Sequence, residues 1–375
     1  MKRVGVVQPM LADYRVPVYL ELSRYCHVDV LFSAARAQAG FGKVIQPHAH
    51  DVRYFEIPTL RPFGDRIGMF QWGLVSYMLR NKPDAVLIFA NPRYLSFWTT
   101  LVVARLCGIS VYAHGHGVYK KSRTDVLYRL MVKLMLRLVT SYIAYAPSVR
   151  ESFAAHGFSD RKVSVADNSM KVEFTVLPQE KTGKEHGILF IGRLRSDCNL
   201  SLLFRVVRRL REEDGLALTV HIVGSGERAS QLREECESNP SIHWHGELYD
   251  QEEIRELSLD CFLGCYPGNA GLSVVHMMAL SLPVVTHDNL SQHGPEVTFI
   301  QDGIHGAFYD QAEPEESLYR KLKMLATQPA TVAQMQHAAF ARYQDLVTPS
   351  LAERLWAIVN EKETASSKSL STVLT

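Results

Sequence analysis

The sequence predicts an α/β protein of two units, each built on a parallel sheet, and three observations support this fold class. The chain has 375 residues, enough for two domains of ordinary size. Short apolar runs alternate with amphipathic stretches of helical length, which is typical of parallel sheets covered by helices. The alternation stops over the segment 168–187, which is polar at its end, and then starts again, so the pattern runs twice along the chain.

The first unit is expected to begin with a buried strand and then to alternate strictly. Its apolar runs predict strands at 4–8, 28–32, 85–90, 110–113 and 142–145. The stretches between and after them predict helices at about 15–25, 66–80, 93–107, 122–139 and 147–156.

The second unit repeats the order. Strands are expected at 188–191, 218–223, 242–244, 261–265 and 283–286, and helices at about 199–213, 227–238, 250–258 and 271–281, with closing helices near 314–328, 331–345 and 350–361. We therefore predict domains at 1–170 and 171–345. A C-terminal helix within 346–362 is expected to pack back toward the first domain, and 363–375, rich in Ser, Thr and Lys, is expected to be a disordered tail.

Composition excludes several classes of protein. With 47% hydrophobic and 21% charged residues, the chain is neither disordered nor a coiled coil. The longest apolar stretch, 94–104, is cut by Arg105 and is too short to span a membrane, and the first residues lack the apolar core of a signal peptide. The six cysteines form no C-x-x-C pair, so a reducing, cytoplasmic compartment is expected.

The net charge of +2 hides a strong asymmetry between the two halves. Residues 1–170 hold 22 Lys/Arg and 11 Asp/Glu, whereas the remaining residues hold 19 and 28. A basic half indicates an anionic partner or surface, although two domains that merely differ in charge remain an alternative. No zinc-finger spacing, RNP-like motif or basic tail supports nucleic acid as that partner.

Two loops of the second unit are suited to an anionic ligand. After the strand 261–265 come small and polar residues at the expected start of a helix, where free N–H groups attract phosphate: Gly268, Asn269, Gly271, Leu272 and Ser273. After the strand 188–191 come Arg193 and Arg195, whose guanidinium groups suit bidentate phosphate bonds. An ordinary strand–helix turn and a pair of solvated arginines are the alternatives.

Other motifs are less specific. The segment Ile222-Val-Gly-Ser-Gly lacks the third glycine of a dinucleotide site, so we predict no nicotinamide cofactor. His114 and His116 follow a strand and suit hydroxyl binding or proton transfer, with a structural role as the alternative. Neither this pair nor His48 and His50 has a third ligand at a recognisable spacing, so no metal is expected.

One helix of the basic half suggests a membrane surface. Arg129, Lys133 and Arg137 lie at i, i+4 and i+8 in the helix expected over 124–140, which is otherwise largely apolar. Such a basic stripe can rest on anionic lipid, and a core helix with a solvated edge is the alternative.

An ordered set of motifs resembles the retaining glycosyltransferases of group 1, or family 4, which have the GT-B fold. The segments are Phe190-Ile-Gly-Arg-Leu, Ile222-Val-Gly-Ser-Gly, Trp244-His-Gly-Glu, Leu282-Pro-Val-Val, Gly294-Pro-Glu296-Val and Asp302-Gly-x-x-Gly306; Tyr14-Arg-Val-Pro, the loop 114–117 and Val165-Ala-Asp-Asn resemble equivalent loops in the first half. The variant Pro-Gly-Asn-x-Gly-Leu with Thr286-His-Asp-Asn resembles a subset linked to bacterial surface polysaccharides.

The resemblance implies two Rossmann-like domains whose sheets face an interdomain cleft, and it implies roles for individual residues. Arg193 would stabilise the diphosphate with Arg195, and His276 would hold the ribose. Glu296 would contact the donor with the 268–273 loop, and Tyr14, Arg15, His114 and His116 would take the acceptor, with His116 near the chemistry. Three departures from the family stand out: Gly268 and His276 replace the two glutamates of the family signature, and Cys198 replaces the usual diphosphate-binding lysine.

We therefore expect a metal-independent enzyme, without a cofactor, that moves a hexose from a nucleotide sugar to a glycan or a polyprenyl-diphosphate-linked acceptor. Synthesis of exopolysaccharide, capsule or lipopolysaccharide, on the cytoplasmic face of the inner membrane, is the implied setting. A non-catalytic nucleotide-sugar-binding subunit, and an epimerase or phosphorylase on the same fold, are the alternatives.

Overall fold

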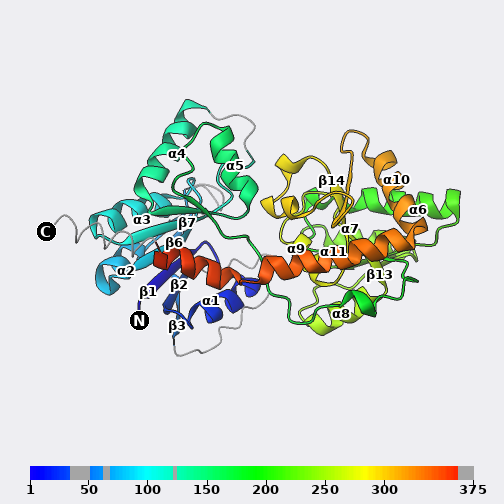
Figure 1. The fold of residues 1–375 in the computed structure, drawn as a ribbon, viewed down its shortest axis with the longest axis horizontal. Coiled ribbons are helices and arrows are strands. Elements are labelled where there is room, and N and C mark those ends of the chain that lie inside the picture. The colour runs from blue at the N-terminus through cyan, green and yellow to red at the C-terminus, as the bar shows by residue number, and fades with distance from the viewer. Residues whose placement is uncertain (34–50, 62–67, 121–124, 362–375) are drawn as a thin grey trace. The chain divides into compact units, whose positions relative to one another are not determined.

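The computed structural model describes residues 1–33, 51–61, 68–120 and 125–361 (Figure 1). These divide into two compact units, the first containing the described residues up to 168 together with 349–361, and the second containing 169–348. The tail expected at 363–375 lies outside the described residues.

Unit 1 is built on a seven-stranded sheet in which every neighbouring pair of strands is parallel. The strand order is β3-β2-β1-β6-β7-β8-β9. The strands are β1 Arg3–Gln8, β2 His27–Ser33, β3 Val52–Ile57, β6 Ala85–Phe89, β7 Ser110–Gly115, β8 Ser141–Ala144 and β9 Val163–Val165, and a small antiparallel pair consists of β4 Thr59–Leu60 and β5 Phe70–Gln71. The helices are α1 Val16–Leu22, preceded by the 3-10 turn η1 Asp13–Arg15, α2 Leu74–Asn81, α3 Leu95–Leu106, α4 Val126–Leu138 and α5 Pro147–Ala155.

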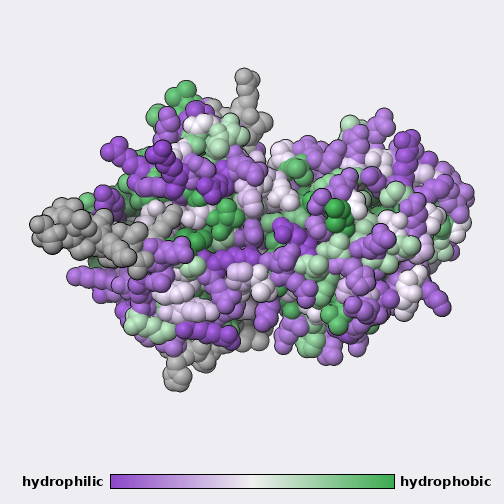
Figure 2. All heavy atoms as spheres, in the orientation of Figure 1, coloured by the Kyte–Doolittle hydropathy of each residue, from purple (hydrophilic) through white to green (hydrophobic). Residues whose placement is uncertain are grey.

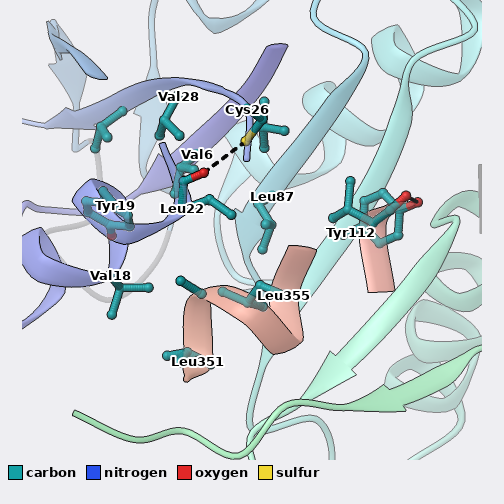
Figure 3. Close-up of a cluster of buried hydrophobic side chains, with 14 of the residues drawn as sticks. Val6, Val18, Tyr19, Leu22, Cys26, Val28, Leu87, Tyr112, Leu351 and Leu355 are labelled. Atoms are coloured by element: carbon teal, nitrogen blue, oxygen red, sulfur yellow. Dashed lines mark hydrogen bonds between the residues drawn. The ribbon is translucent and has the colours of Figure 1, made fainter. Parts of the chain in front are cut away.

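The chain end completes the core of unit 1. A helix over 351–361 places Leu351, Leu355 and Val359 in one buried cluster with residues of β1, β2, β6 and α1 (Figure 3). The hydroxyl of Tyr112 on β7 donates to the carbonyl of Val359 at 3.1 Å. Each buried aliphatic side chain contributes about 1.5–3 kcal/mol, so this helix is an integral part of unit 1.

Unit 2 has a six-stranded parallel sheet in the order β12-β11-β10-β13-β14-β15. The strands are β10 Gly187–Ile191, β11 Thr219–Val223, β12 Ile242–Trp244, β13 Cys261–Cys265, β14 Val284–His287 and β15 Gly306–Tyr309. The helices are α6 Leu200–Asp214, α7 Ala229–Ser238, α8 Gln251–Leu259, α9 Ser273–Ala279, α10 Pro314–Thr327 and α11 Pro329–Val347, with 3-10 turns η2 Pro178–Glu180, η3 Ser196–Cys198, η4 Leu290–Gln292 and η5 Pro295–Phe299.

The predicted strands all form, but three edge strands of the two large sheets were missed, namely β3, β9 and β15, and so was the small pair β4 and β5. An edge strand is paired on one side only, so its sequence need not be a continuous apolar run. In β3, Arg53 binds the buried Asp29 of the neighbouring β2 at 2.7 Å and Glu56 is exposed, which disguises the strand.

Two helix predictions need correction. The helix expected over 66–80 begins only at Leu74, because β5 occupies Phe70–Gln71. The helix expected over 271–281 begins at Ser273 and ends at Ala279. Among the helices in the described parts of the chain, none is both long and apolar enough to cross a bilayer.

Candidate functional site

The loops that follow β10, β11, β13 and β14 gather at one edge of unit 2, because parallel strands end at the same edge of a sheet. They contain the residues predicted to bind a donor. The loops after β10 and β11, together with the end of β12 and the loop that follows it, are tied together through glycines: the N–H of Gly224 donates to the carbonyl of Gly246 at 2.7 Å, and Trp244 Nε1 donates to the carbonyl of Gly224 at 2.9 Å. A Cβ on Gly224 would lie 2.9 Å from the carbonyl carbon of Gly192, so only glycine allows this approach.

The loop between β13 and α9 packs directly on the turn η3. The N–H of Asn269 donates to the carbonyl of Asp197 at 3.0 Å. A Cβ on Gly268 would lie 2.7 Å from the carbonyl carbon of Cys198 and closer still to the carbonyl oxygen of Asp197. The glycine that stands in the place of the family glutamate is therefore required by a backbone-to-backbone contact.

The loop between β13 and α9 is also held by hydrogen bonds from side chains that the sequence did not identify as its partners. Tyr309 donates its hydroxyl to the carbonyl of Pro267, and Thr286 Oγ1 donates to the carbonyl of Tyr266 at 2.8 Å. These partners come from β14 and β15, one or two strands away in the sheet. The loop is thus fixed before any ligand arrives, which is the preorganisation that a binding site needs.

Two stacked histidines complete this support. The N–H of Ala270 donates to Nδ1 of the buried His293 at 3.0 Å, so the proton of this ring is on Nε2, which donates to the carbonyl of His287 at 2.9 Å. The rings of His287 and His293 lie 3.8 Å apart. His287 Nε2 is 3.3 Å from Oδ1 of Asn269. The arrangement requires His293 to be neutral, because a proton on Nδ1 would replace an accepted bond with a repulsion.

The helix that was expected to offer free N–H groups to an anion is shorter than predicted. Since α9 spans only seven residues and begins at Ser273, Gly271 and Leu272 belong to the loop. The loop after β10 lies close to the start of this helix, because Ser273 Oγ is 3.2 Å from the position of a Cβ on Gly192, the residue before Arg193. Positive charge for an anion therefore has to come mainly from this arginine loop.

Arg193 is half-buried in that loop, whereas Arg195 is exposed and forms an ion pair with Asp197 at 3.4 Å. Cys198 is buried at the end of the turn, and its burial raises the pKa of the thiol. The cysteine thus offers no replacement for the lysine of the family, and the two arginines are the cations of this loop.

His276 and Glu296 are brought to the same edge. His276 lies one helical turn after Ser273; its Nε2 is buried and has no hydrogen-bond partner among the described residues. Burial lowers the pKa of His276 to about 4, so the ring is neutral at pH 7. Glu296 is buried, and its Oε2 lies 3.9 Å from the position of a Cβ on Gly271.

The predicted acceptor residues gather at the carboxyl edge of the sheet in unit 1. The ring of Tyr145 contacts both His114 and His116, with centroids 4.4 and 4.7 Å apart. Arg15 donates to Oδ1 of Asn168, and its guanidinium carbon lies 5.2 Å from the ring centroid of the exposed Tyr14.

His114 differs from the other three. It is 6% exposed, its Nε2 has no hydrogen-bond partner among the described residues, and burial lowers the pKa of its ring well below the ordinary value. Together with Gln8, Arg15, Tyr19 and Tyr145, it lines a cavity. Across the described parts of both units, no group of three or more His, Cys, Asp or Glu side chains is placed to hold a metal ion.

Comparison with known proteins agrees with this geometry. Residues 185–328, which hold every donor-side residue discussed above, match the family model described as glycosyl transferases group 1. This part of the chain is a group 1 glycosyltransferase domain. The resemblance drawn from the sequence motifs is therefore confirmed.

One curated relative of this chain is the lipopolysaccharide 1,6-galactosyltransferase of Salmonella typhimurium. The two are 20% identical over 232 residues, an alignment that covers 58% of this chain and 58% of the relative. The match thus spans less than two thirds of the relative's length.

Solved structures show the fold. Anabaena HepE in complex with UDP-glucose has a TM-score of 0.69 at 15% identity and covers 98% of this chain and 100% of its own. An S. aureus TarM mutant with UDP and other ligands has a TM-score of 0.69 at 12% identity, covering 96% and 100%. The lipopolysaccharide outer core galactosyltransferase WaaB has a TM-score of 0.60 at 13% identity, covering 93% and 99%. The chain has the GT-B glycosyltransferase fold, as the motifs implied.

Proposed function

We propose that the protein is a retaining glycosyltransferase that moves a sugar from a nucleoside diphosphate donor to a glycan or lipid-linked acceptor in bacterial surface polysaccharide synthesis. The observation that carries the proposal is the packing of the Arg193–Cys198 segment and of the buried Glu296 against the 266–272 loop, with His276 on the helix that follows, all within the matched domain. UDP or UDP-glucose bound to the structurally similar HepE and TarM supports uridine diphosphate as the leaving group.

Departure of a nucleoside diphosphate leaves growing negative charge on the phosphate oxygens, which the site has to stabilise. Arg193 is the first candidate, because it is half-buried and so acts in a medium that screens charge less than water does. Arg195 forms an ion pair with Asp197, so we assign it a supporting role. Asn269, Leu272 and Ser273 would line the donor path, and the neutral His276 would bind ribose hydroxyls.

Unit 1 is proposed to hold the acceptor. Its predicted residues, Tyr14, Arg15, His114 and His116, lie at one sheet edge, and the first half of the chain carries a large excess of basic residues. That excess suits an acceptor with phosphate groups, such as a polyprenyl-diphosphate-linked glycan. We assign His116 to the position nearest the reacting sugar. All six cysteines are free, which agrees with a reaction on the cytoplasmic face of the membrane.

The test is a screen of nucleotide sugars by thermal shift, followed by calorimetry and turnover with acceptor extracts. Arg193→Ala should weaken uridine diphosphate binding by roughly 10- to 100-fold, as expected for loss of a charge-assisted bond, and should abolish turnover. Arg208→Ala, on the exposed side of α6, is the matched control and should change neither. Turnover should also survive EDTA.

Unchanged binding and turnover in Arg193→Ala would refute the phosphate role. Donor binding without transfer to any acceptor would identify a nucleotide-sugar-binding subunit instead. Phosphate-dependent product formation, or release of an epimerised sugar, would identify a phosphorylase or an epimerase.

A further inference from the structure

The outer face of α4 carries a row of exposed apolar side chains. Val126, Leu127, Leu130 and Leu134 are 75%, 69%, 58% and 48% exposed. Helical spacing places all four within one arc of about 100° around the helix. Figure 2 shows hydrophobic surface at the upper end of this helix, where α4 begins. Large apolar side chains gathered in one exposed row are typical of a docking surface.

The residues around this row are basic. Lys133 and Arg137 are exposed and lie on one flank of the row, and α4 contains no Asp or Glu. At the C-terminal end of the helix, Lys162 Nζ donates to the carbonyl of Val139 at 2.9 Å. Burial lowers the pKa of Lys162, and the charge of the nearby Arg105 lowers it further. The apolar row therefore ends at a cluster of cations.

The third basic residue predicted for this face is not on it. Arg129 turns toward the segment after α5, where it donates to the carbonyl of His156 at 2.9 Å and lies over the ring of Phe158. The basic stripe predicted from Arg129, Lys133 and Arg137 therefore has two members rather than three. The apolar row occupies most of the exposed face.

We propose that α4 is a membrane-docking helix that inserts its apolar row into the surface of an anionic phospholipid bilayer. The leucines would lie below the headgroups, and Lys133 and Arg137 would pair with lipid phosphates. An anionic bilayer satisfies both features at once, because it covers apolar side chains and supplies negative charge beside them. The link between this surface and a lipid-linked acceptor rests on the proposed function, whereas the docking itself does not.

The experiment is co-sedimentation of the full chain with vesicles of phosphatidylcholine alone or mixed with phosphatidylglycerol. We expect the wild type to bind the mixed vesicles. Leu130→Ser with Leu134→Ser should weaken binding roughly tenfold or more, because two leucine side chains that would be buried in the bilayer are removed. Lys133→Gln with Arg137→Gln should remove the preference for phosphatidylglycerol.

The matched control is Leu177→Ser with Met324→Ser in unit 2, two apolar side chains that are 48% and 38% exposed. It should bind vesicles like the wild type. Equal weakening in the control, or a wild type that stays in the supernatant, would overturn the proposal. So would a wild-type dimer without vesicles that Leu130→Ser with Leu134→Ser dissociates, since the row would then be a contact between copies. Calorimetry with uridine diphosphate on the same samples separates failure of docking from failure of the proposed function.

Discussion

Restoring the family glutamate at position 268 should damage the domain rather than improve it. The space beside Gly268 is filled by backbone: a Cβ would lie 2.7 Å from the carbonyl carbon of Cys198 and closer to the carbonyl oxygen of Asp197. Neither atom is the end of a flexible side chain, so the turn η3 or the loop has to move. Since Gly268 does not have a positive φ, the whole effect of Gly268→Ala is steric.

Overpacking of this kind costs about 1–3 kcal/mol. For a unit of the size of residues 169–348, that corresponds to a fall in Tm of about 2–12 °C. Gly268→Glu should be at least as destabilising as Gly268→Ala. Both variants should also bind uridine diphosphate more weakly, because displacement of η3 shifts the neighbouring Arg195.

The assay is differential scanning calorimetry, with Gly271→Ala as the matched control in the same loop. A Cβ at Gly271 meets only Oε2 of Glu296, at 3.9 Å, which is ordinary van der Waals contact. Gly271→Ala should therefore keep the wild-type Tm within about a degree. If Gly268→Ala and Gly271→Ala unfold at the same temperature, the close-packing argument is wrong.

Two further predictions concern the histidines of unit 2. Burial lowers the pKa of His276 from the ordinary 6.5 to about 4, so between these pH values the unfolded chain binds more protons than the folded chain. The Tm of the wild type should therefore fall as the pH drops from 6.5 to 4. Calorimetry across this range should give a shallower slope of Tm against pH for His276→Gln, and an unchanged slope would contradict the burial of the ring. His293→Leu leaves the N–H of Ala270 without its acceptor, which costs about 1–3 kcal/mol and loosens the 266–272 loop, whereas His293→Gln can still accept that bond. Calorimetry with uridine diphosphate should give the highest affinity for the wild type, a lower one for His293→Gln and the lowest for His293→Leu. Equal affinity of all three would show that His293 does not support the loop.

The residues identified as candidates from the sequence are mostly those that the fold gathers at two sheet edges. This was possible because a parallel sheet brings the residues after its strands to one edge, so a strand prediction already selects the loops. The sequence did not show which residues support the 266–272 loop. Thr286, His287, His293 and Tyr309 lie 18 to 42 residues from their partners in sequence, and no local pattern links them to Tyr266–Ala270.

The sequence by itself determined the alternation of strands and helices, the repetition of that order and the resemblance to a glycosyltransferase family. These properties are local: they depend on apolar runs, helical spacing and short motifs that each lie within a few residues. Only the tertiary structure decided why position 268 is glycine, why Cys198 is no substitute for a lysine, and why Arg129 leaves the basic face of α4. Each of those depends on which backbone or side chain packs against the residue from elsewhere in the chain, and packing is settled only when the whole unit has folded.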